Sequence, residues 1–409
     1  MEPTIYAKLK ALTPTDIECR LIDTRFEKIN YDKPTDFVVM SLTTLNAKYA
    51  YEIAKEYRKR GVKVILGGIH ANLCPEEAME HADVLSIGES ELIWKDIIND
   101  AKNGNLKKIY KSEGRYDFKD YKMDLSIFKG KHYMPIHCVE TSRGCLFKCE
   151  FCSLAPMYNQ QIVYRDADDV VEEIKSYKDP FIVFTDENFG NNIKHTSEIL
   201  KKIIPLKKHW SAQMSVNSLQ QDEFVALMKK SGCVNVFIGF ESVDKNVLET
   251  MNKISNLKLD MYKQAMDNCV KNDIAISCGF LNGYIDNDKD SIDANWEFAN
   301  SFQFFNCSYI NLIPIPGTPA YQKLKDKKLL VDEKWWLSDI FYYNRKPLFY
   351  SETHSPDIMQ KQGFDRMVEF STFKNIFKRF CISQYKPKMR FYILLMNIFL
   401  RYNFKAFGG

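Results

Sequence analysis

Short apolar runs alternate with helical patterns through the first hundred residues of the chain. The alternation is typical of a parallel sheet with helices on its faces. We therefore expect a doubly wound, Rossmann-like unit over residues 1–105. Its predicted strands are Glu18–Ile22, Phe37–Ser41, Val62–Leu66 and Val84–Ile87, and its predicted helices are 1–13, Ala47–Arg60, Pro75–His81 and Ser90–Ala101.

The alternation resumes after residues 106–135, a charged and aromatic stretch that we interpret as a linker. From Val139 onward, strand and helix alternate at steps of ~30–40 residues, which predicts six strands in an open (β/α)6 partial barrel over residues 136–325. The strands after the first are expected at Phe181–Thr185, Ser211–Ser215, Asn235–Gly239, Ala275–Phe280 and Ser308–Ile313. Residues 326–409 form a helical extension, in which Trp335, Trp336 and Phe341–Tyr343 are expected to pack over the open side of the barrel.

Three cysteines follow the first barrel strand with the spacing C-x3-C-x2-C, at Cys145, Cys149 and Cys152. Thiolates at this spacing can turn inward onto one soft-metal centre. A structural zinc site needs a fourth Cys or His, and none occurs within forty residues after Cys152. Three thiolates leave one iron of a 4Fe–4S cluster without a protein ligand, so that this iron can bind a substrate or cofactor. The competing interpretation is three buried or zinc-bound cysteines.

With Phe151 directly before its last cysteine, the motif resembles the signature of the radical S-adenosylmethionine superfamily. The resemblance implies that the free iron chelates the amino and carboxylate groups of S-adenosylmethionine. One electron from the cluster then releases a 5′-deoxyadenosyl radical. The resemblance also implies that the three cysteines are the cluster ligands and that Phe151 lies beside the adenine.

Polar residues follow several of the predicted barrel strands, at what becomes one mouth of the barrel. S-adenosylmethionine offers an ammonium, a carboxylate, a ribose diol and an adenine edge, and each needs a fixed partner. We expect Glu187 to accept from the amino group. Ser215 and Asn217 suit the ribose or carboxylate, and Glu241 suits the ribose hydroxyls. Each of these residues could instead be a helix cap or part of a salt bridge at the barrel mouth.

The predicted N-terminal strands end in Ser41–Thr44, Gly67–His70 and Gly88–Glu91, and ligands bind at this edge of such sheets. Together with the cluster motif, the layout resembles the cobalamin-binding-domain subclass of the superfamily, which includes anaerobic porphyrin ring cyclases and carbon or phosphorus methyltransferases. The resemblance implies a groove for the cobalamin nucleotide tail, lined by Ser41, Thr43, Gly67, Gly68, Gly88 and Glu89.

Two departures from that subclass bear on cobalamin. The Asp-x-His-x-x-Gly loop, whose histidine ligates cobalt, is absent, and the first histidine is His70, which we expect to be a hydrogen-bonding residue. The chain also begins after the point where the family's first strand is expected, which predicts a truncated sheet. Two outcomes stay open: cobalamin bound without a histidine ligand, or a shortened sheet that has lost the cofactor.

Composition narrows the class of protein further. The balance of 57 basic and 53 acidic residues gives a net charge of +4, so no nucleic-acid partner is expected. No signal peptide and no run of ~18 apolar residues is present, which predicts a cytoplasmic protein. From Phe370 to Gly409 no Asp or Glu occurs, and basic residues alternate with aromatics. Such a tail can lie on the inner, anionic membrane surface or pack on the barrel with a solvated basic face.

The leading hypothesis is a radical S-adenosylmethionine enzyme that functionalises an unactivated carbon by methylation, cyclisation or rearrangement, in a lipid, pigment or natural-product pathway. Its expected cofactors are a 4Fe–4S cluster and S-adenosylmethionine, with cobalamin left open. Its expected partners are a small-molecule or lipid-like substrate and an electron donor such as flavodoxin or ferredoxin. Two alternatives remain: a cobalamin-independent enzyme that abstracts hydrogen, and a non-catalytic iron–sulfur sensor or membrane-associated scaffold.

Overall fold

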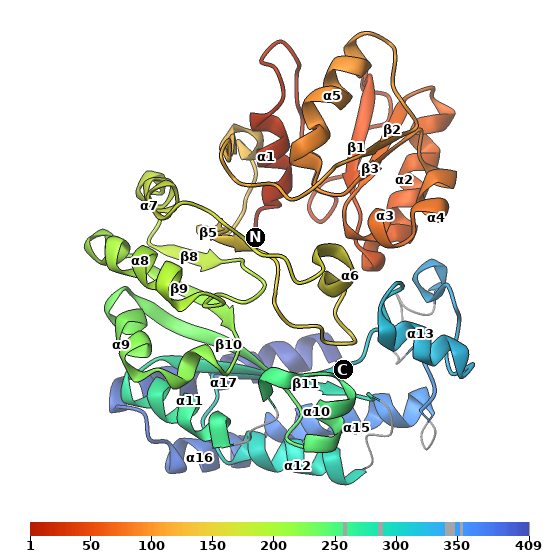
Figure 1. Ribbon diagram of the computed structural model, residues 1–409. Helices are drawn as coiled ribbons and strands as arrows, with labels where there is room; N and C mark the ends of the chain where they lie inside the picture. Colours follow the sequence, from red (N-terminus) through yellow and green to blue (C-terminus); the bar gives the residue numbers. More distant parts are fainter. Residues whose placement is uncertain (257–259, 285–288, 340–347, 352–354, 409) are drawn as a thin grey trace.

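The structure is a computed structural model that describes residues 1–256, 260–284, 289–339, 348–351 and 355–408 (Figure 1). Two α/β units follow one another along the chain, and helices from the C-terminal part cover the second unit. The N-terminal unit lies at one end of the molecule and the C-terminal helices lie away from it (Figure 1). Within the described ranges, no helix combines the length and apolarity needed to cross a membrane.

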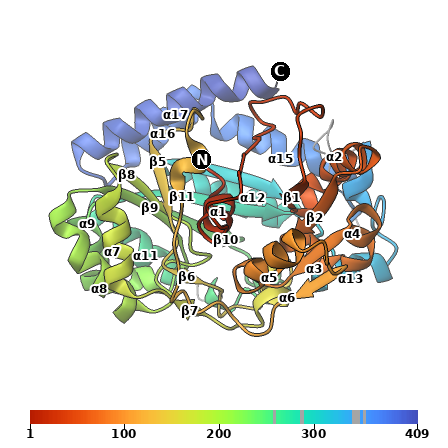
Figure 2. The same ribbon diagram turned by 90° about the horizontal axis from the view of Figure 1, so that it is seen from above.

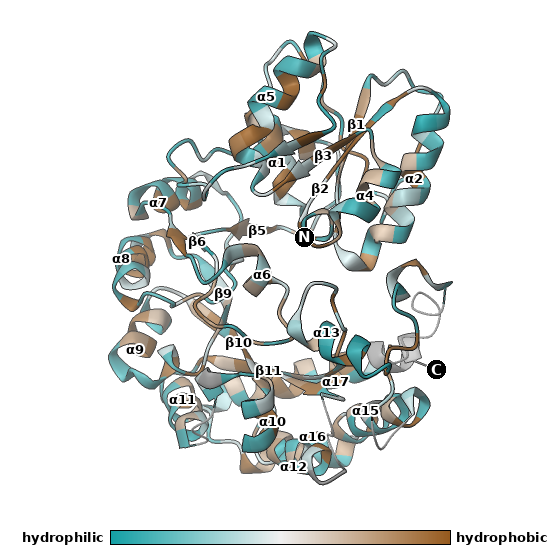
Figure 3. Cartoon of the chain, turned by 45° about the vertical axis from the view of Figure 1, so that its right-hand side comes forward, coloured by the Kyte–Doolittle hydropathy of each residue, from teal (hydrophilic) through white to brown (hydrophobic). Residues whose placement is uncertain are grey.

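Four parallel strands form the N-terminal sheet, in the order β1-β2-β3-β4. Alternate residues of β2 face opposite layers, since Val64 and Leu66 pack with α2 and α4 whereas Ile65 packs with α1 and α5. Figure 3 shows the hydrophobic strands between helices whose outer sides are largely hydrophilic. The α/β unit with helices on both faces is confirmed. Its elements are α1 (Thr4–Ala11), β1 (Phe37–Ser41), α2 (Ala47–Lys59), β2 (Lys63–Gly67), α3 (Ile69–Leu73), α4 (Pro75–His81), β3 (Val84–Ile87), α5 (Ser90–Lys102) and β4 (Ile109–Lys111).

Two expectations for the N-terminal unit are wrong. Residues Glu18–Ile22 form no strand, because this segment and β1 line a cavity instead of pairing. The second correction concerns β4, which lies inside the stretch interpreted as a linker and pairs with β3. The sheet therefore extends to Lys111.

Six parallel strands form the second sheet, in the order β12-β11-β10-β9-β8-β5. Because strands that follow one another in sequence are also neighbours in the sheet, their carboxyl ends open on one rim. The predicted (β/α)6 partial barrel is confirmed. Its strands are β5 (Ile136–Val139), β8 (Phe181–Phe184), β9 (His209–Met214), β10 (Cys233–Glu241), β11 (Ala275–Asn282) and β12 (Asn306–Asn311). Its helices are α7 (Ala167–Ser176), α8 (Ile193–Ile203), α9 (Asp222–Lys230), α10 (Lys245–Thr250), α11 (Asp260–Lys271) and α12 (Lys289–Asn300).

The C-terminal part is helical, as expected. Its helices are α13 (Pro319–Asp326), α15 (Pro356–Phe370), α16 (Phe373–Ile382) and α17 (Pro387–Gly408), and the last three run along one flank of the barrel (Figure 2).

Trp335 and Trp336 do not cover the open side of the barrel, which corrects the sequence expectation. Both indoles are buried in the apolar cluster of α2 and β2. Trp336 Nε1 donates to Glu77 Oε1 at 2.8 Å, so this segment ties the extension to the N-terminal unit. Phe341–Tyr343 lie outside the described residues.

Candidate active site

The cysteine-rich loop follows β5 and leaves the sheet at a glycine. The short strands β6 (Ser142–Arg143) and β7 (Val163–Tyr164) pair antiparallel around it. Gly144 has a φ of 109°, and a Cβ there would lie 2.2 Å from the carbonyl oxygen of Gln161. Only glycine fits so close an approach. The direction in which Cys145 leaves the sheet is therefore fixed by the backbone.

The three cysteine side chains of this loop are shielded from solvent to different degrees. Cys149 is buried, and Cys145 and Cys152 are half-buried. Burial raises the pKa of Cys149 to about 11, with Lys253 opposing the rise and the thiols of Cys152 and Cys145 adding to it. Within the described ranges, no three His, Cys, Asp or Glu side chains converge on one metal-ion position. Thiolates that ligate three different irons need not share one position, so the arrangement of the loop is compatible with a cluster.

Two carboxylates that follow β8 accept hydrogen bonds from residues at the start of the cysteine-rich loop. Asp186 accepts hydrogen bonds from the N–H of Thr141 at 2.7 Å, the hydroxyl of Thr141 at 2.6 Å and the hydroxyl of Ser142 at 2.5 Å. Glu187 Oε2 accepts from the N–H of Gly144 at 2.9 Å. Glu187 Oε1 accepts no hydrogen bond from another residue in the described part of the chain. This arrangement is compatible with the expected role of accepting from an amino group.

The ends of β8 and β9 are joined through an asparagine. Asn188 Oδ1 accepts from the N–H of Ser215 at 2.8 Å, and its Nδ2 donates to Ser215 Oγ at 3.3 Å. Ser215 is half-buried, whereas Asn217 is exposed at the start of the next turn. The fold therefore brings Ser215 next to the β8 loop that carries Glu187, whereas the exposed Asn217 side chain makes no such contact within the described residues.

Glu241 ends β10 at an irregularity of the sheet. It has a φ of 64°, and the pairing of β10 with β11 shifts register just before it. Asn256 Nδ2 donates to two main-chain carbonyls of β10, both at 2.9 Å, and stabilises this end. Glu241 Oε1 accepts from Lys253 Nζ at 3.0 Å, and that ammonium lies 5.9 Å from the ring centroid of Phe151. Lys253 therefore links the Glu241 carboxylate to the cysteine-rich loop.

A buried ion-pair network joins the cysteine-rich loop to the N-terminal sheet. Arg143, which is 7% exposed, donates at 2.8 Å to one oxygen each of Glu140, Glu89 and Glu91. The second oxygen of Glu89 accepts from Arg115 Nε at 3.0 Å. The loop at the end of β3 is thus held directly against the residue that precedes Gly144.

The glycines at the N-terminal strand ends serve packing within the chain. A Cβ on Gly68 would lie 2.6 Å from the main-chain nitrogen of Leu42, and one on Gly88 would lie 2.0 Å from Ser112 Oγ. The carboxylate of Glu89 is committed to its two arginines. The side chain of Glu89 is therefore not free to line a ligand groove, contrary to the expectation.

The carboxyl ends of the N-terminal strands present main-chain groups and hydroxyl groups to a ligand. Ser41 is half-buried and Thr43 is exposed at the end of β1, beside Gly67 of β2. His70 is fully buried between Thr44 Oγ1 at 3.2 Å and Glu77 Oε1 at 3.3 Å, as expected for a hydrogen-bonding residue. This donor set fits a cobalamin bound without a histidine ligand.

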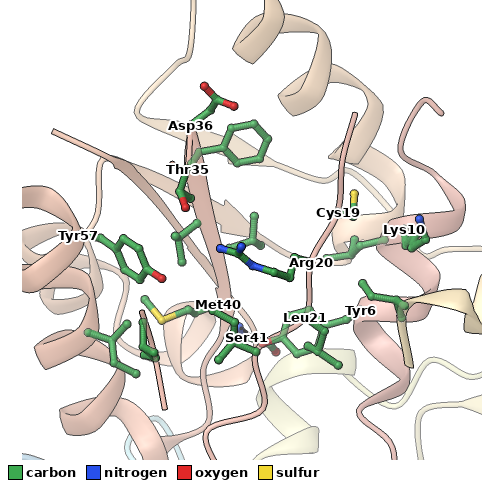
Figure 4. A pocket seen from close by; sticks show the side chains of 18 of the residues that line it. Tyr6, Lys10, Cys19, Arg20, Leu21, Thr35, Asp36, Met40, Ser41 and Tyr57 are labelled. Carbon is green, nitrogen blue, oxygen red and sulfur yellow. Dashed lines mark hydrogen bonds between the residues drawn. The ribbon is translucent and has the colours of Figure 1, made fainter. Parts of the chain in front are cut away.

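A cavity of about 400 Å³ opens beside β1 (Figure 4). Residues 17–22 form one wall and β1 forms the other, with side chains of α2 and α5 also among the lining residues. Figure 4 shows Arg20 extending from the first wall toward β1. Because β1 is the outer strand of the sheet, the cavity occupies the place that a further strand would take. The sheet edge that was predicted to be truncated therefore borders a cavity. At this edge the hydroxyl of Tyr6 accepts a hydrogen bond from the N–H of Ser41 at 3.1 Å.

Comparison with known proteins defines the class. The model of the radical SAM superfamily matches residues 139–295, and that of the B12 binding domain matches residues 12–98. The chain belongs to the radical SAM superfamily, in the group that also carries a B12-binding domain. It is an enzyme that uses a 4Fe–4S cluster and S-adenosylmethionine, so the leading hypothesis from the sequence is confirmed.

Particular relatives refine this class. Bacteriochlorophyllide d C-8(2)-methyltransferase of Chlorobaculum tepidum is 31% identical, over 93% of this chain and 87% of the relative. The C-12(1)-methyltransferase of the same bacterium is 30% identical, over 76% of this chain and 70% of the relative. Among solved structures, the radical S-adenosylmethionine methyltransferase TsrM from Kitasatospora setae, with tryptophan and a SAM analogue bound, has a TM-score of 0.62 at 14% identity, over 81% of this chain and 72% of that one. TsrM thus shares the fold.

Sequence reasoning missed four residues that shape the site: Arg143, Asp186, Asn188 and Lys253. Asp186 and Asn188 stand directly beside Glu187, and Arg143 stands two residues before Cys145, so this proximity to predicted positions was the available signal. Lys253 stands twelve residues after Glu241 in a stretch without a motif, and only the fold brings it there.

Proposed function

We propose that the protein is a cobalamin-dependent C-methyltransferase whose substrate is a large apolar ring system of the chlorin type. The main observation behind the proposal is the ion-pair contact between the two α/β units. Arg143, beside the cysteine-rich loop, is ion-paired with Glu89 and Glu91 at the edge where a sheet of this kind binds its ligand. The similarity to a bacteriochlorophyllide d methyltransferase over 93% of the chain supports the substrate class.

The residues of the cysteine-rich loop and the β8 loop are proposed to hold the cluster and S-adenosylmethionine. When bound, these groups and cobalamin supply a carbon-centred radical and a transferable methyl group. Cys145, Cys149 and Cys152 are the proposed iron ligands. Glu187 is proposed to accept from the ammonium of S-adenosylmethionine through Oε1, while Gly144 holds its other oxygen in place.

Residues from the next strand ends are proposed to bind the rest of S-adenosylmethionine. The Ser215 hydroxyl, oriented by its neighbour Asn188, and the Asn217 amide suit the ribose or carboxylate. Glu241, oriented by Lys253, suits the ribose hydroxyls. Phe151 is proposed to pack beside the adenine.

The N-terminal edge is proposed to hold the nucleotide tail of cobalamin through main chain and hydroxyl groups. The proposed lining is Ser41, Thr43, Gly67, Gly68 and Gly88. Glu89 is proposed not to contact cobalamin directly. Its ion pairs with Arg115 and Arg143 fix the loop that carries Gly88.

Methyl transfer from labelled S-adenosylmethionine tests this function. Protein purified anaerobically with cobalamin and reconstituted with iron and sulfide is reduced with a flavodoxin system and given bacteriochlorophyllide d. The expected result is a trideuteromethyl group on the pigment, together with S-adenosylhomocysteine and 5′-deoxyadenosine. A Cys149→Ser variant, which removes one proposed iron ligand, is the inactive control. Cleavage of S-adenosylmethionine without methyl transfer to any chlorin would contradict the proposal.

A second candidate is a cobalamin-independent enzyme that abstracts hydrogen. It is favoured by the intrachain packing against Gly68 and Gly88, because the chain itself requires these glycines whether or not a ligand binds beside them. The visible spectrum of protein isolated with cobalamin supplied separates the two candidates. Corrinoid absorption beyond the cluster bands supports the methyltransferase, and its absence supports the second candidate.

The proposed partners are a reductant such as flavodoxin or ferredoxin and a membrane surface. A chlorin-type substrate partitions into lipid, and the basic C-terminal part is proposed to bring a cytoplasmic enzyme to that phase.

A further inference from the structure

Helices α16 and α17 are anchored to the barrel by polar and apolar side chains together. Arg379 is fully buried and donates to an amide oxygen at 2.8 Å and to a main-chain carbonyl at 2.9 Å. Asn397, which is 7% exposed, donates to the carbonyl of Phe305 at 2.8 Å. Ile376 and Ile393 are buried beside them. The side of these helices that faces the barrel is therefore mixed, and it holds their most polar buried residues.

The opposite side of α17 is apolar and exposed. Phe391, Leu395, Phe399 and Tyr402 follow one another at intervals of four, four and three residues, which places them on one helical face. Their exposed fractions are 56%, 63%, 58% and 62%. A helix at a water-facing surface normally has the reverse arrangement, with its charged residues outward. The apolar stripe of α17 is therefore suited to a non-aqueous neighbour.

Helix α16 continues this surface. Phe373 and Phe377 are 41% and 49% exposed, and the guanidinium of Arg401 on α17 lies 4.5 Å from the ring centroid of Phe373. The exposed aromatics of the two helices thus adjoin. Contiguous apolar surface of this kind marks an interaction site more often than a solvated face.

Positive charge lies beside the stripe, and the two helices carry no negative charge of their own. The last acidic residue is Glu369, so neither α16 nor α17 contains an Asp or Glu. Exposed lysines stand on α16, in the connection and at the start of α17: Lys374, Lys378, Lys386 and Lys388. The charge is therefore complementary to an anionic surface.

We propose that the face formed by α16 and α17 binds the surface of an anionic phospholipid bilayer, with α17 lying in the plane of the interface. Its apolar stripe would enter the boundary between head groups and acyl chains, while the lysines meet lipid phosphates. A second copy of this chain is a poorer partner, because a symmetric contact would bring like-charged lysines together without a carboxylate between them. Nucleic acid would leave the apolar stripe without a counterpart. The inference extends the membrane contact proposed above and rests only on these two helices.

Vesicle sedimentation of the full chain tests the proposal. Vesicles of phosphatidylcholine alone are compared with vesicles that also contain phosphatidylglycerol, at low and at high salt. Binding is expected only with phosphatidylglycerol, and salt should weaken it. Leu395→Asp on the stripe is expected to weaken binding roughly tenfold or more. Leu92→Asp, at a 39% exposed position on α5, is the matched control and should bind like the parent protein.

Three controls separate loss of lipid binding from loss of folding or of catalysis. Circular dichroism checks that Leu395→Asp is folded, and the charge-reversed pair Lys386→Glu with Lys388→Glu should lose binding through charge alone. Cleavage of S-adenosylmethionine in solution should be unchanged in all three variants, so failure of lipid binding is separable from failure of the proposed chemistry. Equal binding of Leu395→Asp and parent protein, or dimerisation by light scattering that Leu395→Asp abolishes without vesicle binding by the parent, would overturn the proposal.

Discussion

Single positions decide how the cysteine-rich loop is held. Gly144 is required because the Gln161 carbonyl leaves no room for a Cβ, and Asp186 gathers three donors from Thr141 and Ser142 beneath the loop. Neither residue needs to touch a cofactor to matter. Both act by fixing the backbone from which the cysteines extend.

Gly144→Ala is expected to lower cluster content. The substitution combines a left-handed φ with a collision at 2.2 Å, so the loop must move, at a cost of about 1–3 kcal/mol. Iron and sulfide per chain after reconstitution measure the effect. Gly104→Ala is a matched control, since Gly104 also has a positive φ but no atom within 4 Å of a Cβ. Equal iron content in the two variants would show that the close approach is unimportant.

The raised pKa of Asp186 predicts how the free energy of unfolding depends on pH. Burial raises the pKa of Asp186 to about 7, against the hydrogen bonds from Ser142 and Thr141. At a pH between the ordinary carboxyl pKa and about 7, Asp186 is protonated in the folded chain and ionised in the unfolded chain. The contribution of the Asp186 proton to stability is therefore present at low pH and is lost as pH rises through about 7. Between pH 5.5 and pH 8 the free energy of unfolding should fall by about 1–2 kcal/mol from this group.

Asp186→Asn should remove that pH dependence. Urea unfolding of the parent protein and the variant, without metal and at both pH values, measures it. Asp267→Asn, at an exposed position on α11, serves as the control and should follow the parent. The prediction fails if Asp186→Asn keeps the parent's slope.

At the scale of elements, the strand ends and the crossing segments position the site. The bridge of Asn188 to Ser215 joins β8 to β9, and Asn256 secures the irregular end of β10 where Glu241 stands. The segment around Trp335 and Trp336 connects the extension to the N-terminal unit. These contacts set which side chains reach the rim.

The two tryptophans allow a paired test of this connection. Trp336 Nε1 donates to the Glu77 carboxylate and Trp335 Nε1 donates to the Pro314 carbonyl, both at 2.8 Å and both buried. Trp336→Phe removes a donor from a charged acceptor and should lower the free energy of unfolding by about 2–3 kcal/mol, whereas Trp335→Phe should cost about 1 kcal/mol. Urea unfolding of both variants measures the difference. The opposite order would mean that the carboxylate is well satisfied by its other donors.

For the whole molecule, the Arg143 network joins the two α/β units. Three carboxylates, Glu89, Glu91 and Glu140, meet three cations, because Lys8 donates to Glu140 at 2.6 Å beside the bonds of Arg115 and Arg143. Although burial opposes it, the charges of Lys8 and Arg143 hold the pKa of Glu140 at about 2. The balanced charges allow the network to be buried between the units.

Arg143→Met should be strongly destabilising. It leaves buried carboxylates without their shared cation, which costs about 3–5 kcal/mol. Calorimetry of the protein without cofactors measures the loss, and separate unfolding of the two units is the expected form. Arg58→Met, which breaks a half-exposed pair with Asp83, should change stability by less than about 1 kcal/mol. If both substitutions cost the same, the network is not what joins the units.

The local sequence determined the two parallel sheets, the barrel order and the cysteine motif of this protein. Apolar periodicity depends on neighbours two to four residues apart, and so does the C-x3-C-x2-C spacing, so both can be read along the chain. Only the tertiary structure decided that Glu18–Ile22 lines a cavity and that β4 extends the sheet. It also decided that Glu89 pairs with Arg143, that Lys253 reaches Glu241, and that the apolar stripe of α17 faces outward. Each of these depends on which surfaces meet in space, and residues far apart in sequence meet only when the whole chain has packed.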